Sequence, residues 1–340
     1  MKITRRKLLT SSVAAVATLA APRLARAGVT LHPDPSGDDW AQFDAAMSGL
    51  RSNRLGWVEF EQLSSAVNFN LKKSVNATGL WSASLRFSPG SIVTSNGFTG
   101  DGAGRPAPLF DFSNSQLSEI ICEGNVSTFL MGFNTSSPAG TVKPNCAIMA
   151  ANVDTKKIRN LCTGGQFSSA AVAFVSCSDF DIIDCGIGNS EPGSPLGNGP
   201  PALILSSLPD WGLWSPYSTF ASYGFVNDGY VRSRVHSIYT PAPWPPVLPQ
   251  ATWTVYVRNG NNIEFDHCLF DNNNRAHMLF QGTSSNIVMD GGKGYSELGV
   301  ALAGVVESGG TVNELKMIGV QPPPGCPRTI GSGYSGLQII

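Results

Sequence analysis

Charged residues are scarce in this chain. Lys, Arg, Asp and Glu make up 14% of its 340 residues, whereas a soluble domain usually contains about 25%. The scarcity argues against helical bundles and coiled coils, because both depend on charged exposed faces. The 37 Gly residues, together with many Ser, Thr and Asn, instead favour a β-rich chain with many turns.

The chain also lacks an excess of positive charge. Its formal net charge of −1 includes six basic residues and no acid within residues 1–27. Without that segment, 23 − 6 = 17 basic residues stand against 24 acidic ones, a net charge of −7. Binding to nucleic acid irrespective of base sequence needs clustered Lys and Arg to displace counterions. We therefore expect no nucleic-acid partner.

Long hydrophobic runs are absent after residue 27, so we expect no membrane span in the mature chain. The first 27 residues have a basic start, an apolar run over residues 8–21 and a small-residue end at Ala25–Ala27, which is typical of a signal peptide. Thr4–Leu9 contains adjacent arginines and is similar to a twin-arginine signal, although an ordinary secretory signal is the alternative. We predict that the twin-arginine machinery exports the precursor and that the mature protein is periplasmic or secreted.

Closely spaced cysteine pairs are missing too. None of the seven cysteines has Cys-x-x-Cys spacing, which argues against zinc ribbons and thioredoxin chemistry. Their odd number leaves at least one unpaired, and several fall at apolar positions of the repeat described next, where we expect buried thiols. The segment Gly97–Gly104 is rich in glycine but opens no helix, so we interpret it as a loop between early coils, not as a phosphate-binding loop.

Short β-like segments recur from about residue 115 onward. In Phe180–Ile187 and Ile263–Phe270, apolar residues fall at positions i, i+2, i+5 and i+7. Segments that start at Ile287 and Leu315 fit in part, and residues 180 to 263 leave room for about three coils with one long excursion. A period of 20 to 30 residues with Asn- and Gly-rich corners is typical of a parallel β-helix. We predict an all-β parallel β-helix (solenoid), with an irregular β-sandwich as the alternative.

The N-terminal part predicts a cap for this solenoid. Asp38–Met47 should form an amphipathic helix with acids in its first turn, and Gly56–Phe60 alternates like a first strand. These features, with Gly37 before the helix and the pattern Asn-Ile-x-Phe-x-x-Cys at Asn262–Cys268, resemble the pectate-lyase-like superfamily over roughly residues 36–320. The resemblance implies a right-handed parallel β-helix in a carbohydrate-active protein. That superfamily contains lyases, hydrolases, epimerases and non-catalytic adhesins, so the fold does not give the activity.

The domain organisation follows from these patterns. We predict a signal peptide over 1–27, an N-terminal segment with a capping helix over 28–55, the β-helix over 56–320 with aromatic loops at 190–222 and 240–250, and a C-terminal tail over 321–340.

Two aspartates are the first candidates for catalysis. If Ile263 and Ile287 occupy equivalent places on neighbouring coils, Asp266 and Asp290 point outward and stack about 4.8 Å apart. Carboxylates this close repel each other, which raises one pKa and creates the acid and base that glycoside hydrolysis needs. Alternatively, the stacked side chains cap turns or bind a stray cation.

Further candidate catalytic residues follow Asp266 in the chain, namely His267, Asp271, Arg275 and His277. A β-elimination lyase needs a base near the sugar C5 and a cation that stabilises the enolate-like intermediate. Arg275 with His277 or Lys293 would suit that chemistry. A hydrogen-bonded structural role is the alternative for either histidine, and Asp271 could serve only to form a turn.

Aromatic residues cluster between residues 211 and 256, which hold four of the seven Trp and five of the seven Tyr. Flat rings with a polar edge suit the apolar faces of sugars, although the loops could also pack their own rings into small cores. We predict that a polysaccharide contacts Trp211, Trp214, Tyr217, Trp244 and Lys293. Residues 160–231 contain acids but no Lys or Arg, which favours a neutral glycan or a Ca²⁺ ion bound by carboxylates. No other cofactor is expected.

The sequence therefore predicts an exported protein whose partner is a polysaccharide. Our first hypothesis is a glycoside hydrolase that uses Asp266 and Asp290. The alternatives are a polysaccharide lyase and a non-catalytic glycan-binding or envelope protein.

Overall fold

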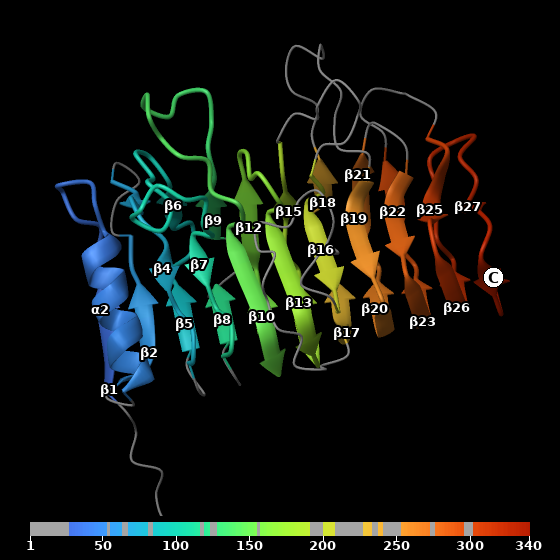
Figure 1. Cartoon of the computed structure of the whole chain (residues 1–340), viewed down its shortest axis with the longest axis horizontal. Helices are drawn as coiled ribbons and strands as arrows, with labels where there is room; N and C mark the ends of the chain where they lie inside the picture. The colour runs from blue at the N-terminus through green and yellow to red at the C-terminus, as the bar shows by residue number, and fades with distance from the viewer. Residues whose placement is uncertain are drawn as a thin grey trace, which may run out of the picture.

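The computed structural model describes residues 27–52, 55–62, 67–80, 84–115, 119–122, 128–154, 157–190, 200–207, 227–232, 237–240, 253–272, 276–295 and 302–340. Within them, the named strands form four sheets, and all of their strand pairs are parallel. Neighbours within each sheet are mostly three strands apart in the chain, so each coil adds one strand to successive sheets. The predicted parallel β-helix is confirmed, and Figure 1 shows its strands lying across a long axis.

Sheet 1, with twelve strands, runs the length of the solenoid. It contains β1 (Ala27–Leu31), β2 (Leu55–Phe60), β5 (Ser84–Phe87), β8 (Glu119–Cys122), β11 (Lys157–Arg159), β14 (Phe180–Ile183), β17 (Asn227–Arg232), β20 (Gly260–Asp266), β23 (Thr283–Asp290), β26 (Thr311–Ile318), β28 (Tyr334–Ser335) and β29 (Gln338–Ile339).

Sheet 2 has nine strands, namely β4 (Val75–Asn76), β7 (Phe110–Asp111), β10 (Ile148–Asp154), β13 (Val172–Ser178), β16 (Leu203–Ser206), β19 (Trp253–Arg258), β22 (Ala276–Gln281), β25 (Gly304–Ser308) and β27 (Thr329–Gly331). Sheet 3 has four, β3 (Phe69–Asn70), β6 (Ile92–Thr94), β9 (Thr128–Met131) and β12 (Leu161–Gly164). Sheet 4 also has four, β15 (Ile187–Gly188), β18 (Ser237–Thr240), β21 (Leu269–Asn272) and β24 (Lys293–Tyr295).

The register of the coils matches the predicted repeat. Ile263 pairs with Ile287, and Ile287 pairs with Leu315. Two steps, from β14 to β17 and from β17 to β20, connect Phe180 with Ile263 through Gly229. The prediction of about three coils between residues 180 and 263 was therefore too high, because both of these coils are longer than the repeat.

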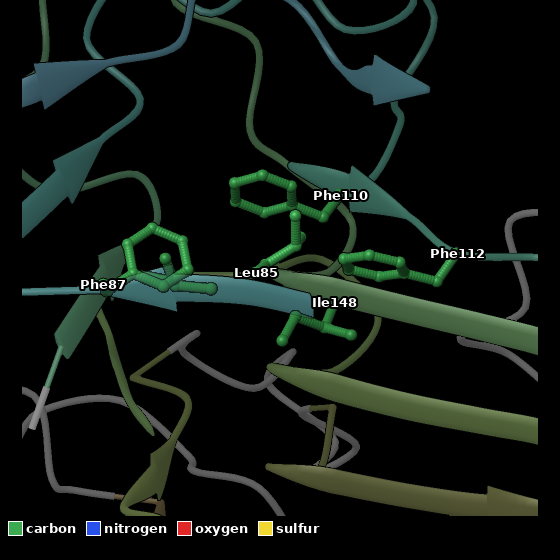
Figure 2. A pocket seen from close by; sticks show the side chains of 6 residues that line it. Leu85, Phe87, Phe110, Phe112 and Ile148 are labelled. Atoms are coloured by element: carbon green, nitrogen blue, oxygen red, sulfur yellow. The ribbon is translucent and has the colours of Figure 1, made fainter. Parts of the chain in front are cut away.

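Apolar side chains fill the interior in stacked rows. The rings of Phe60 and Phe87 stack with their centroids 4.6 Å apart, so that the same residue type repeats on neighbouring coils. Figure 2 shows side chains from β5, β7 and β10 facing one another inside the early coils. The space between them does not hold a water molecule, so it is packed core and not a ligand site.

Cysteines belong to this core. The six cysteines whose side chains are described are buried, as expected for apolar positions of the repeat. Cys185 and Cys268 are each 1% exposed. Burial raises the pKa of the Cys185 thiol to about 12, so this residue stays protonated and unreactive.

The coils turn after sheet 1 through a row of residues with left-handed backbone, which we call the corner row: Asn160, Asp184, His267, Gly291 and Gly319, with φ between 50° and 64°. The backbone N–H of each donates to a carbonyl of the next coil, at 2.6 to 3.1 Å. Gly adopts this conformation without strain, and Asn, Asp and His tolerate it better than most residues. The corner row therefore fixes the residue types that can stand at this edge.

A helix closes the N-terminal end of the solenoid. α2 (Trp40–Arg51) buries Phe43 and Met47 against the first coils, and Figure 1 shows it at the end of the molecule beside β1 and β2. Because the helix begins at Trp40 with Asp39 as N-cap, the predicted acids in its first turn lie before it. The buried Asp39 carboxylate accepts hydrogen bonds from the backbone N–H of Asp34 and Asn70 instead, at 2.7 Å each.

The other end of the solenoid has no such helix among the described residues. Residues 321–340, predicted as a tail, contain β27, β28 and β29, which pair with β25 and β26. Across the described ranges, no helix has the length and apolar character needed to cross a membrane.

Candidate functional site

The predicted carboxylate pair lies on the outer face of sheet 1. Asp266, at the end of β20, pairs in register with Asp290, at the end of β23. Their neighbours Phe265 and Met289 are 1% exposed and face the interior, so alternation turns both aspartates outward. The predicted stacking of these two residues is confirmed.

Asp266 forms a hydrogen bond with the next residue in the chain. The Nδ1 atom of His267 hydrogen-bonds Oδ1 of Asp266. The Asp266 side chain is 12% exposed, whereas that of His267 is 53% exposed. A carboxylate that accepts from Nδ1–H fixes the tautomer of the ring and leaves Nε2 for another partner. The structure thus joins two predicted site residues into a carboxylate–imidazole pair.

Gly291 makes room for this imidazole. His267 stands in the corner row, and Gly291 occupies the same place on the next coil. A Cβ at Gly291 would lie 2.8 Å from Cδ2 and 2.9 Å from Nε2 of His267, so the ring packs directly over the glycine. Sequence analysis missed this contact, although the pair Gly291–Gly292 after Asp290 is the kind of signal that marks a close approach.

Arginine adds a positive charge on the other side of Asp266. Arg232 pairs in register with Asp266, and its Nη2 atom donates to Oδ2 of Asp184 at 3.1 Å. Sequence analysis did not select Arg232, because the coil that brings it beside Asp266 could not be aligned from the repeat. The outer face at this point therefore carries charges of both signs.

Sheet 4 continues the surface past the corner row. Lys293 and Tyr295 point outward from β24, with the Lys293 Nζ atom 4.8 Å from the centre of the Tyr295 ring. Tyr295 is 40% exposed, and it pairs in register with Asp271. Lys293 and Asp271 thus lie on a different sheet from Asp266 and Asp290, with the corner between them.

His277 is not at the surface. It is 0% exposed, and neither ring nitrogen has a hydrogen-bond partner. Its ring centre lies 6.0 Å from that of Phe270, and a Cβ at Gly294 would lie 2.5 Å from Nε2. Burial lowers the pKa of His277 to about 4. The expectation of an accessible His277 beside the aspartates is therefore corrected, because the imidazole points into the core.

Several predictions fall outside the described residues. These are the signal peptide up to residue 26, most of both aromatic loops, and the candidates Arg275, Trp211, Trp214, Tyr217 and Trp244. Within the described part of the chain, no three His, Cys, Asp or Glu side chains converge as they would to hold a metal ion.

A cleft that sequence analysis missed lies near the N-terminal end. Its volume is about 480 Å³, and Asn68, Lys72 and Asn96 contribute to its lining. Asn70 ties its walls together by donating to the carbonyl oxygens of Gly37 at 2.8 Å and Asn96 at 3.0 Å. The cleft offers amides and one ammonium group to a polar ligand.

Comparisons with known proteins identify no family. The chain matches no family model and no curated protein sequence. It is similar in structure to PfbA, a surface adhesin of Streptococcus pneumoniae, with 12% identity and a TM-score of 0.48 over 89% of this chain and 80% of that one. It is also similar to ORF18 of Geobacillus virus E2, with 14% identity and a TM-score of 0.38 over 92% of this chain and 65% of that one, just under two thirds of its length. The fold assignment rests on the strand register and not on either likeness.

Proposed function

We propose that the protein binds a neutral polysaccharide on the outer face of its β-helix, around Tyr295 and His267, without cleaving it. The observation that carries the proposal is the ring of Tyr295, which is 40% exposed on β24 and has the ammonium group of the exposed Lys293 over one of its faces. An aromatic ring packs against the apolar face of a sugar, while neighbouring polar groups bond the hydroxyls.

The surroundings of the ring suit an extended neutral chain. Glu264, Asp266 and Asp290 on the adjacent face of sheet 1 are accompanied by Arg232 and Lys316, so this face carries charges of both signs and has no general attraction for an acidic polymer. Coils follow one another about every 4.8 Å, so a polymer along the solenoid axis meets side chains from successive coils. This open face can contact such a polymer along its length but does not enclose it.

Binding agrees better with the geometry than cleavage by a carboxylate pair. Hydrolysis needs two carboxyl groups that both reach the scissile bond. Asp266 has a side chain that is 12% exposed and already bonded to His267, so it is poorly presented to a substrate. Asp290 alone would supply only one of the two groups.

Glycoside hydrolysis is the second candidate, favoured by the register that stacks Asp266 on Asp290. In that case Asp290→Asn should abolish the release of reducing ends. A lyase loses His277 as a candidate, because that residue is buried, whereas its alternative Lys293 is exposed on β24.

Export is also part of the proposal. The basic start and apolar run within residues 1–27 support a signal peptide, and Arg5 and Arg6 support the twin-arginine route. Replacing both arginines with lysine should leave the precursor in the cytoplasm. Correct processing of that variant would contradict the twin-arginine route but not export itself.

The binding test is affinity electrophoresis of the purified mature protein in gels that contain neutral polysaccharides, with polygalacturonate as an acidic contrast. We expect retardation by a neutral polymer, and Tyr295→Ala should weaken it about tenfold, the effect of losing one stacked ring. Phe129→Ala is the matched control, because Phe129 is 39% exposed and lies on sheet 3.

Three outcomes would contradict this proposal. Equal losses in the Tyr295 and Phe129 variants would show that the ring has no specific role. Loss of binding in Asn68→Ala but not in Tyr295→Ala would move the site to the N-terminal cleft. New reducing ends that disappear with Asp290→Asn would establish the hydrolase instead.

A further inference from the structure

The cleft near the N-terminal end is built from segments that are far apart in the chain. Asn70 on β3 and Thr94 on β6 line it together with Gly37, which precedes α2, and Pro138, which follows β9. Its volume of about 480 Å³ lies within the range of about 300–1,000 Å³ that is usual for pockets holding small molecules. Several coils therefore contribute walls to one cavity of ligand size.

A single buried amide holds these walls in place. Asn70 is 9% exposed, and its Nδ2 atom donates to the carbonyl oxygens of Gly37 and Asn96. Its Oδ1 atom accepts from the N–H of Asn96 and from the hydroxyl of Thr94, at 2.8 Å each. Both donors and both acceptor sites of the amide are thus in use. Asn70 therefore fixes the shape of the cleft and leaves ligand binding to its neighbours.

Three other side chains of the lining offer N–H groups to a ligand. Oδ1 of Asn68 accepts from Nε2 of Gln62 at 3.1 Å, which leaves Nδ2 of Asn68 unpaired within the described ranges. The side chain of Asn96 is exposed and forms no hydrogen bond with any other described residue. Lys72 passes beside Gly97, where a Cβ would lie 3.9 Å from the lysine Cε, and in the described part of the chain no carboxylate forms an ion pair with it.

The charge of the cleft favours a ligand with one negative charge. Its described lining contains one Lys and no Asp, Glu or Arg. The carboxylate of Asp39, which adjoins the cleft at Asn70, is buried and already accepts from the backbone N–H of Asp34 and Asn70. Ammonium and amide N–H groups bind an anion through charge-assisted hydrogen bonds. One cation balances a carboxylate, whereas a phosphate dianion would keep an uncompensated charge.

We propose that this cleft binds a small hydroxycarboxylate, whose carboxylate contacts Lys72 and Asn68. The side chains of Asn96 and Thr94 each carry donor and acceptor groups, which suits the hydroxyls of such a ligand. Val67, which is 42% exposed, adds an apolar contact for the carbon chain. Binding here goes beyond the glycan binding proposed at Tyr295 and does not depend on it.

Isothermal titration calorimetry of the mature protein with gluconate tests this assignment. Sorbitol is the matched ligand control, because it has a carbon chain of the same length and the same kind of hydroxyl groups but no carboxylate. We expect one gluconate per chain and no binding of sorbitol. Lys72→Met keeps an unbranched apolar stem and removes the charge, so it should weaken gluconate binding at least tenfold, the effect of losing one hydrogen bond to a charged group.

Lys73→Met is the matched protein control. Lys73 is exposed, its Nζ atom lies 4.7 Å from the centre of the Trp40 ring, and it does not line the cleft. This variant should bind gluconate as tightly as the wild type, whereas Asn68→Ala should weaken binding without changing the net charge. Circular dichroism and thermal unfolding check that each variant is folded.

Four outcomes would overturn the proposal. These are a wild type that does not bind millimolar gluconate, equal binding of sorbitol, equal losses in the Lys72 and Lys73 variants, and full affinity in Asn68→Ala.

Discussion

Replacing His277 with leucine should stabilise the protein, and the gain should grow as the pH falls. The imidazole is 0% exposed, and neither of its nitrogens has a hydrogen-bond partner. An unsatisfied buried polar group costs about 1–3 kcal/mol. Leucine has a similar volume and no polar atom, so His277→Leu should raise the free energy of unfolding by that amount at neutral pH.

The pH dependence follows from the pKa of His277, which burial lowers from 6.5 to about 4. In the unfolded chain, this residue takes up a proton as the pH falls through 6.5, while the folded protein resists protonation until about pH 4. The unfolded state therefore gains stability between these values, at about 1.4 kcal/mol per pH unit. Relative to pH 7.5, the wild type should lose about 2 kcal/mol at pH 5 and about 3 kcal/mol at pH 4 through this residue.

Urea unfolding at a series of pH values measures the effect directly. The difference between His277→Leu and wild type should widen from pH 7.5 to pH 4, because only the wild type carries the depressed pKa. His32→Leu is the control, because it removes a histidine whose side chain is exposed and not buried. A constant difference between His277→Leu and wild type, or a variant less stable at every pH, would refute the reasoning.

Two further predictions concern the corner row and the thiols. Gly319→Ala should lower the free energy of unfolding by about 1–2 kcal/mol because of its left-handed φ alone. Gly291→Ala should lower it further, because the new Cβ also collides with His267. Urea unfolding of both variants measures the difference, and equal losses would mean that the His267 ring moves freely. The buried thiols should react with a thiol reagent only on unfolding, since burial raises the pKa of Cys146 and of Cys185; rapid labelling of either in the native protein would contradict their burial.

The repeat made much of the fold predictable. Residues that recur every second position, such as Ile263 and Phe265, identify the inward face of a strand, and the equivalent Ile287 gives the register between coils. The stacking of Asp266 on Asp290 followed from that register. The predicted number of coils between residues 180 and 263 was wrong, because alignment by period assumes that each coil has the same length and the coils there are unequal.

Corners account for most of what sequence analysis missed. Alternation predicts that His277 points away from the core if Met278 points into it. Both are buried, and so are Val305 and Val306 on the next coil, because His277 lies against Gly294, where sheet 2 meets sheet 4. A two-residue period holds only within a strand, so the side of a corner residue has to come from the three-dimensional structure. The hydrogen bond between His267 and Asp266 could not be predicted from the sequence for the same reason.

The direction of the hydrogen bonds has a mechanical consequence. Strands lie across the long axis in Figure 1, so the bonds between coils run along that axis. A force that pulls the helical cap away from the last coil acts on every ladder of bonds in series, and the weakest ladder opens first, because each coil is held only by its neighbours. Coils should therefore separate one after another under such a force.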